Sequence, residues 1–169
     1  MKKIILIFLI FNNLLFGWDF FNNLFLSLTM DSSSSPKKSV FIRNNAQQVV
    51  IDKTKHLMWQ DNKNVKTITK TYEGAIDYCK NLNLDGYHDW YLPTNSELNT
   101  LLIDCSTSVL NINHTFKNVA NDDYWTSNID KNNKNYALCI YFKPNMGFTY
   151  LAHKFLKNHV RCVRKINSN

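Results

Sequence analysis

The side chains that most often carry out chemistry are present in this sequence, but their spacing does not assemble an active site. The histidines lie far apart, without the short spacings typical of metal ligands: His56, His88, His114, His153 and His159. The nucleophile pattern Gly-x-Ser-x-Gly is absent, and the chain lacks the clustered glycines of a phosphate-binding loop. We therefore expect a protein that is not an enzyme, with no catalytic residues, no metal and no cofactor.

A small acidic cluster offers a calcium site as an alternative. Asp85, His88 and Asp89 lie close together beside Trp90. A calcium ion needs six or more oxygen ligands, and this stretch supplies few carboxylates. The Asp-Gly pair at 85–86 is typical of a tight turn, so a turn-forming role is favoured.

Four cysteines could form disulfides or hold zinc. They are Cys79, Cys105, Cys139 and Cys162. An even number in an exported chain favours two disulfides, and three pairings are possible. Zinc and redox chemistry are disfavoured because no Cys-x-x-Cys or His-x-x-x-His spacing occurs.

Positive charge is concentrated in the last quarter of the chain. The net charge is +7; residues 131–169 contain eight Lys or Arg and no acidic residue, against 12 Lys or Arg and 13 acidic residues before them. A one-sided basic surface favours acidic partners such as sulfated or uronic glycans, anionic lipid or nucleic acid. The alternative is an ordinary solvated strand surface. The candidate binding residues are Lys154, Lys157, Arg161, Arg164 and Lys165.

The chain divides into an export segment, a linker and one domain. Residues 1–30 begin with two lysines and an apolar run, which predicts a signal peptide or an N-terminal anchor. Residues 31–38 form a Ser-rich linker. Residues 39–166 are long enough for one domain with one core. We expect the domain in the periplasm, on the outer surface or secreted.

The stretch 85–102 has the clearest local pattern. Its Asp-Gly turn leads into an aromatic strand over 87–92, which Pro93 ends. Thr94 and Glu97 form the capping box of a following helix. Three leucines share one face of that helix: Leu98, Leu101 and Leu102.

The remaining elements follow from alternation and turn signals. Strands are expected at 39–43, 122–129, 135–143, 148–155 and 159–166, the last three as a meander, and a hairpin over 48–60. Thr71 begins a helix that runs to residue 82, and 63–70 is expected to be a loop. Met58 and Trp59 are expected in the core.

Several motifs resemble the Lcl C-terminal domain family, a domain of unknown function. The central stretch is similar to GY-x-DWRLPT-x-x-EL-x-x-L, with Tyr91 in place of Arg, and the hairpin is similar to V-x-D-x-x-T-G-L-M-W-Q-D, with His56 in place of Gly. DDYWTSNI resembles YWSS, and VRCVR at 160–164 matches the family's ending. The motif residues are Trp59, Trp90, Leu92, Pro93, Thr94, Glu97 and Trp125.

This family is similar to C-type-lectin-like folds and more distantly to formylglycine-generating enzymes. The resemblance implies an α+β, C-type-lectin-like fold, with two helices packed on twisted antiparallel sheets and two disulfides. Lectin-like folds tie the first helix to the last strand. The resemblance therefore pairs Cys79 with Cys162 and leaves Cys105 and Cys139 for the second bond. The cysteine setting of the formylglycine enzymes is not matched.

Two kinds of binding function follow. The first is an exported bacterial binding module, such as an adhesin, that recognises acidic or sulfated glycans through the basic C-terminal strands. The second is an envelope domain that binds an envelope or host surface protein, or itself. Nucleic acid is not expected as a partner, and the membrane is expected to be contacted only through an uncleaved N-terminal segment.

Overall fold

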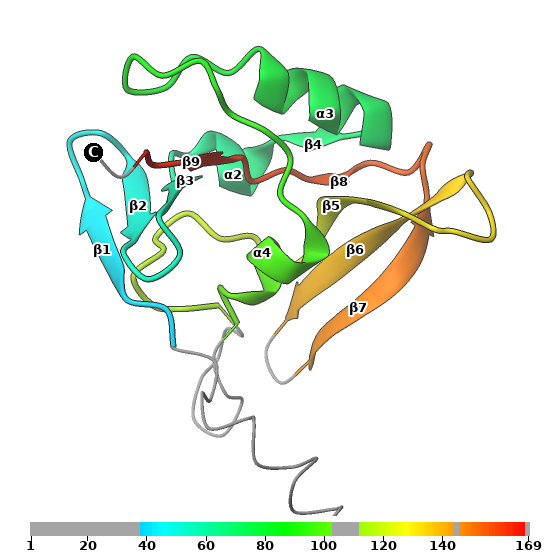
Figure 1. The fold of residues 1–169 in the computed structure, drawn as a ribbon. Helices are drawn as coiled ribbons and strands as arrows, with labels where there is room; N and C mark the ends of the chain where they lie inside the picture. Colours follow the sequence, from blue (N-terminus) through cyan, green and yellow to red (C-terminus); the bar gives the residue numbers. More distant parts are fainter. Residues whose placement is uncertain (1–37, 103–111, 144–145, 168–169) are drawn as a thin grey trace, which may run out of the picture. The chain divides into compact units, whose positions relative to one another are not determined.

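Two β-sheets carry the fold in the computed structural model, which describes residues 38–102, 112–143 and 146–167 (Figure 1). Their strand orders are β1-β2-β3-β9 and β4-β8-β5-β6-β7. The expected export segment lies outside the described residues, as does nearly all of the expected linker. Within the described residues, no helix has the length and apolar character needed to cross a bilayer.

The first sheet is built on the predicted hairpin. Its strands are β1 (Phe41–Asn44), β2 (Val49–Asp52), β3 (Leu57–Gln60) and β9 (Val163–Lys165). Asp52 is buried at the hairpin turn, where its Oδ1 accepts hydrogen bonds from the backbone N–H groups of Thr54 (2.9 Å) and Lys55 (3.1 Å). His56 closes the turn with a φ of 52°, in the left-handed region that favours glycine.

The second sheet contains the predicted strands 122–129, 135–143 and 148–155, with small shifts at their ends. Its strands are β4 (Thr69–Lys70), β5 (Asp123–Ile129), β6 (Tyr136–Lys143), β7 (Met146–His153) and β8 (Asn158–His159). β5, β6 and β7 are antiparallel neighbours, whereas β8 lies parallel to β5 at the pair Tyr124–His159.

The prediction of a single strand at 159–166 is wrong, and so is the prediction that this strand completes a meander. The chain pairs with β4 and β5 as β8, leaves that sheet, and joins β3 as β9. Between the two strands, the backbone N–H of Gln60 donates to the carbonyl of Cys162 (2.9 Å). The crossing depends on partners distant in sequence, so strand alternation did not show it.

The helices follow their capping signals. In α3 (Tyr72–Lys80), the Thr71 side chain caps the first turn. α4 (Asn95–Asn99) has the full predicted capping box of Thr94 and Glu97 but ends before the last two leucines of the pattern. A short helix, α2 (Asn64–Thr67), and the strand β4 occupy the stretch that was expected to be a loop.

The predicted aromatic strand at 87–92 is also wrong. Only isolated bridges form there, between Leu84 and Tyr87 and between Tyr91 and Val163. The Asp-Gly turn is confirmed, since Asp85 and Gly86 both have positive φ values. The indole N–H of Trp90 donates to the carbonyl of Tyr87 (3.1 Å), which curls the segment instead of extending it.

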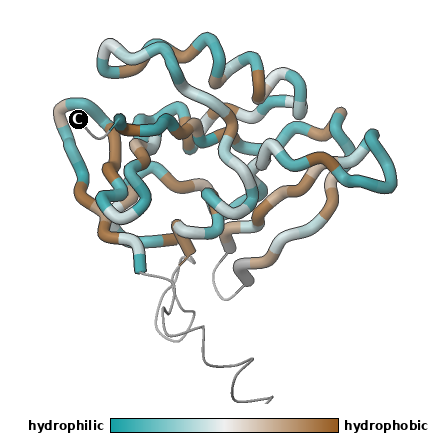
Figure 2. Tube along the Cα trace, in the orientation of Figure 1, coloured by the Kyte–Doolittle hydropathy of each residue, from teal (hydrophilic) through white to brown (hydrophobic). Residues whose placement is uncertain are grey.

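The core consists of two apolar clusters. One surrounds Cys79, Cys162 and Trp125, and the other surrounds Trp59, Leu98 and Phe142. Figure 2 shows apolar colour along the inner strands and alternating along α3. Both clusters lie within residues 38–169, which form one compact unit. This unit therefore contains the apolar burial needed to fold by itself.

Candidate functional site

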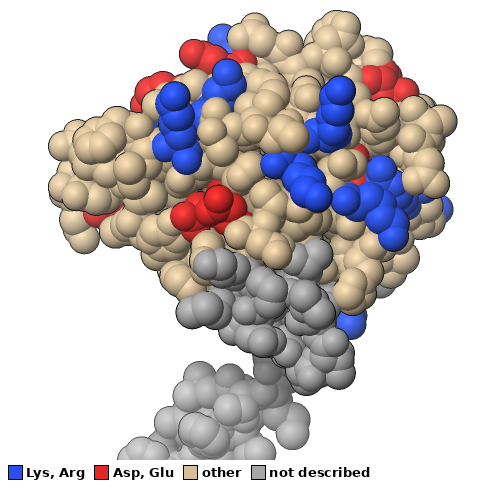
Figure 3. Space-filling model, turned by 180° about the vertical axis from the view of Figure 1, so that it is seen from behind, with Lys and Arg blue, Asp and Glu red and all other residues tan. Residues whose placement is uncertain are grey.

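The five cations of the predicted basic face do not share one surface. Lys157 and Lys165 are exposed, and Lys154 is partly buried. Arg161 and Arg164 are buried, so they are corrected from surface to interior positions. Figure 3 shows lysines and arginines in several places on one face, with acidic residues between them.

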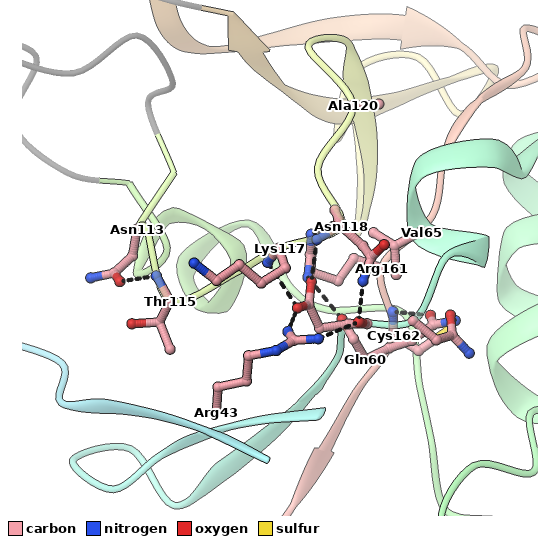
Figure 4. Close-up of polar contacts among 12 residues, drawn as sticks. Arg43, Gln60, Val65, Asn113, Thr115, Lys117, Asn118, Ala120, Arg161 and Cys162 are labelled. Carbon is pink, nitrogen blue, oxygen red and sulfur yellow. Dashed lines mark hydrogen bonds and ion pairs between the residues drawn. The ribbon is translucent and has the colours of Figure 1, made fainter. Parts of the chain in front are cut away.

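Arg161 is a fully buried structural cation (Figure 4). Its Nη1 donates to the carbonyl of Gln60 (2.8 Å) and to Oδ1 of Asp61 (3.0 Å). Its Nη2 donates to the carbonyl of Asn118 (2.7 Å), and the guanidinium lies 4.7 Å from the ring centre of Phe116. Arg161 thereby ties the end of β3 to the loop that precedes β5.

Asp61 is the anion that compensates this buried charge. One of its carboxylate oxygens forms an ion pair with Arg43. The carboxylate also accepts the backbone N–H groups of Lys117 (2.9 Å) and Asn118 (3.1 Å). A buried carboxylate with two arginines and two amide donors is well satisfied, as a structural site requires.

The electrostatic state of the two arginines follows from this burial. Loss of solvent lowers the pKa of Arg161 to about 10, although neighbouring Tyr124 acts in the opposite direction. Burial, followed by repulsion from Arg161, lowers the pKa of Arg43. Arg161 stays charged at neutral pH but has no exposed surface for a ligand.

Arg164 forms a second ion pair, with the exposed carboxylate of Asp89. Its Nε and Nη2 bind the two carboxylate oxygens of Asp89 (2.6 and 3.0 Å), and its guanidinium stacks 3.8 Å from the ring centre of Tyr87. The hydrogen bond from Arg164 lowers the pKa of Asp89. Asp89 therefore orders the turn segment against β9, and no cluster of three potential metal ligands occurs in the described residues.

Lys154 is held by α3. Its ammonium group lies 3.6 Å from Glu73 and 4.6 Å from the ring centre of Tyr72. Lys157 and Lys165 are the two members of the predicted set whose side chains remain exposed.

The cysteines form one of the two expected disulfides. Cys79 of α3 is bonded to Cys162, as the resemblance implied. Cys139 is instead a free, buried thiol that accepts a hydrogen bond from Asn158 (3.0 Å), and Cys105 lies outside the described residues. Burial raises the pKa of Cys139 to about 12, so the thiol is protonated and unreactive at neutral pH.

The motif residues shape the corner around α4. Glu97 accepts hydrogen bonds from the hydroxyl of Tyr91 (2.8 Å) and from the backbone N–H of Thr94 (2.8 Å). Tyr91, which replaces the family's Arg, thus remains linked to the capping carboxylate. Burial and this hydrogen bond raise the pKa of Tyr91. The other motif side chains are buried: Trp59, Trp90, Leu92, Pro93 and Trp125.

A cavity of about 410 Å³ opens where the hairpin, α4 and the end of β9 meet. We call it the basic cavity. Its lining residues are Lys55, His56, Leu57, Ser96, Glu97, Thr100, Lys165, Ile166 and Asn167. Two lysines, one histidine and one carboxylate line the cavity together with the hydroxyl of Ser96, so the cavity suits an anionic, hydrogen-bonding ligand.

Sequence reasoning identified only one cation of this cavity. Lys165 was predicted, whereas Lys55 and His56 were not. They meet because β3 pairs with β9, with Leu57 opposite Lys165. The one local signal was His56, which stands at a turn position where the similar family motif has glycine. This histidine adds an imidazole to the lining of the cavity.

These features define a disulfide-linked α+β domain with an exposed basic cavity. The Lcl C-terminal domain family matches residues 48–164, and the chain belongs to this family. No match was found among the curated proteins.

Proposed function

We propose that this chain is an exported, non-catalytic binding module that recognises acidic polysaccharides through the basic cavity. The supporting observation is that Lys55 and Lys165, both exposed, line one cavity with Ser96, which carries a hydroxyl donor. The hydroxyl of Thr100, also in the lining, already donates to the carbonyl of Glu97 (2.7 Å). Sulfate and carboxylate groups accept hydrogen bonds from ammonium and hydroxyl donors, and charge assistance strengthens those from lysine.

The cavity contains two lysines and a single acidic residue, Glu97, so its lysines outnumber its carboxylate. Both oxygens of Glu97 accept hydrogen bonds from Tyr91 or Thr94. Neither Lys55 nor Lys165 forms an ion pair with any described residue. Both ammonium groups are therefore available to a ligand.

Export and a lectin-type function fit the rest of the chain. A basic and then apolar N-terminus is typical of exported proteins, and a disulfide persists in oxidising compartments. The family's similarity to C-type-lectin-like folds supports a carbohydrate ligand by analogy alone.

The test is binding of residues 38–169 to immobilised heparin, used as the acidic-polysaccharide probe, at two salt concentrations. Lys55→Ser with Lys165→Ser should weaken binding roughly tenfold, because each exposed ion pair contributes up to about 1 kcal/mol. Binding should also weaken with added salt. Lys53→Ser with Lys66→Ser is the matched control, since both lysines are exposed outside the cavity. Equal losses in the two double variants, or no loss in either, would contradict the proposal.

Self-assembly is the second candidate, because β7 is the outer strand of its sheet. It follows β6 at the end of the strand order, and Phe148 and Leu151 are exposed along it. Unpaired strand edges with apolar side chains favour pairing with another chain. Sedimentation velocity over a concentration series tests this: Leu151→Lys should abolish any dimer, whereas a protein that stays monomeric at all concentrations excludes it.

A further inference from the structure

Two turns meet at one end of the second sheet. The turn over 130–135 connects β5 to β6, and the turn over 154–157 connects β7 to β8 (Figure 1). Tyr136 pairs with His153, and the backbone N–H of Lys154 donates to the carbonyl of Asn135 (2.9 Å). We call residues 129–135 and 154–157 the tip.

The tip exposes large apolar side chains. Phe155 is 68% exposed and Leu156 is 47% exposed, on adjacent positions of one turn. Ile129, at the end of β5, is 39% exposed. Two large exposed apolar side chains on adjacent positions of one turn are a candidate interaction surface.

These side chains are held outward by an ordered backbone. The ring of Phe155 lies 3.9 Å from that of His153, which in turn contacts Tyr136 at 5.0 Å between ring centres. The backbone N–H of Leu156 donates to the carbonyl of His153 (2.9 Å). Because the turn is already fixed, a partner would bind it without a large ordering cost.

The two turns of the tip also carry lysines. Lys131, Lys134 and Lys157 are exposed, while Lys154 is paired with Glu73. The one acidic residue of the tip, Asp130, accepts the backbone N–H of Asn132 (3.2 Å) within its own turn. The tip therefore combines exposed apolar side chains with an excess of positive charge.

We propose that the tip docks on an anionic lipid bilayer. Phe155 and Leu156 would enter the boundary between headgroups and acyl chains, and Lys131, Lys134 and Lys157 would bind lipid phosphates. Phenylalanine and leucine supply apolar surface that can enter that boundary, and lysine can lay its apolar stem along it while its ammonium group stays among the headgroups. This contact is separate from the basic cavity, with which the tip shares no residue.

The composition of the tip favours a bilayer over a protein partner. Lysine is depleted in protein–protein interfaces, whereas exposed lysines beside apolar side chains are typical of segments that lie on anionic membranes. The apolar side chains also stand on turns, where they can enter a lipid surface without a complementary pocket.

Vesicle sedimentation of residues 38–169 tests the proposal, with phosphatidylcholine vesicles compared with vesicles that also contain phosphatidylglycerol. The wild-type domain should sediment with the anionic vesicles only. Phe155→Ser with Leu156→Ser should lower the partition coefficient about tenfold or more, because two large apolar side chains no longer leave water. The matched control is Val40→Ser, which removes a 53% exposed apolar side chain outside the tip and should bind like wild type.

A second pair of variants measures how much the lysines contribute to vesicle binding. Lys134→Gln with Lys157→Gln should reduce binding to anionic vesicles by roughly tenfold, whereas Lys53→Gln with Lys66→Gln should not. Heparin binding should be unchanged in all tip variants, so failure here is distinct from failure of the polysaccharide proposal. The proposal is overturned if the wild-type domain does not bind anionic vesicles, or if the serine double variant binds them like wild type. It is also overturned if the tip variants instead change the oligomeric state.

Discussion

At the scale of single residues, cations of similar sequence context differ in burial. Arg161 and Arg164 alternate with apolar residues near the C-terminus, yet both are buried in ion pairs, and Lys165 beside them is exposed. Sequence alternation alone could not separate these cases, because the partners Asp61 and Asp89 come from distant parts of the chain.

Replacing Arg161 by alanine should lower the free energy of unfolding by about 3–5 kcal/mol, because Asp61 loses a buried partner and the backbone carbonyls of Gln60 and Asn118 lose their donors. Lys165→Ser should change it by less than about 0.5 kcal/mol. Urea unfolding measures both values. A small effect of Arg161→Ala would show that the buried network contributes little.

His56→Gly should raise the free energy of unfolding by about 0.5–1 kcal/mol, because glycine adopts the observed φ of 52° without the penalty of a side chain. His88→Gly is the control, since His88 is exposed and lies outside the left-handed region. It should lower stability slightly. Thermal unfolding compares the two, and a destabilised His56→Gly protein would mean that the imidazole makes a stabilising contact.

At the scale of elements, local signals predicted structure well and distant pairings were missed. The capping box at Thr94, the cap at Thr71 and the hairpin over 48–60 depend on neighbours in the chain, and the structure contains all three. The division of the last strand depends on distant β3 and β5, and the basic cavity depends on the same pairing of β9 with β3. The sequence therefore indicated the elements that line the site, but it did not indicate that the hairpin and β9 lie side by side.

Thr94→Ala should lower the free energy of unfolding by about 1 kcal/mol, because the backbone N–H of Glu97 loses its acceptor at 3.2 Å. Thr94→Ser keeps the hydroxyl and should retain most of the stability. Thr94 also fixes the carboxylate of Glu97, which lines the basic cavity with Lys55 and Lys165. Because a released carboxylate could pair with these lysines, the alanine variant should bind heparin more weakly than the serine variant does. Chemical denaturation and heparin affinity are measured on the same three proteins, and an alanine variant as stable as wild type would contradict the role of the cap.

At the scale of the whole domain, the excess charge of the last quarter is divided among separate uses. Arg161 pairs with the buried carboxylate of Asp61, and Arg164 pairs with the exposed carboxylate of Asp89. One lysine lines the basic cavity, and the lysines of the tip lie on the same turns as exposed apolar side chains. A net charge of +7 thus describes several local environments and no single basic face. Both exposed sites depend on β9 and β8 being held in their separate sheets.

The Cys79–Cys162 disulfide is the covalent link that fixes this division, because it ties α3 to the segment between β8 and β9 across 83 residues. In the chain-entropy account a loop of that length contributes about 4.5 kcal/mol, and measured values are commonly about 2–4 kcal/mol. Cys79→Ala with Cys162→Ala should therefore lower the free energy of unfolding by about 2–4 kcal/mol and weaken heparin binding as β9 loosens. Cys139→Ala is the control, since it removes a buried free thiol without breaking a cross-link and should cost less. Thiol titration completes the test: Cys139 should react only after unfolding, and a bond between Cys105 and Cys139 in peptide mass maps would contradict the free thiol.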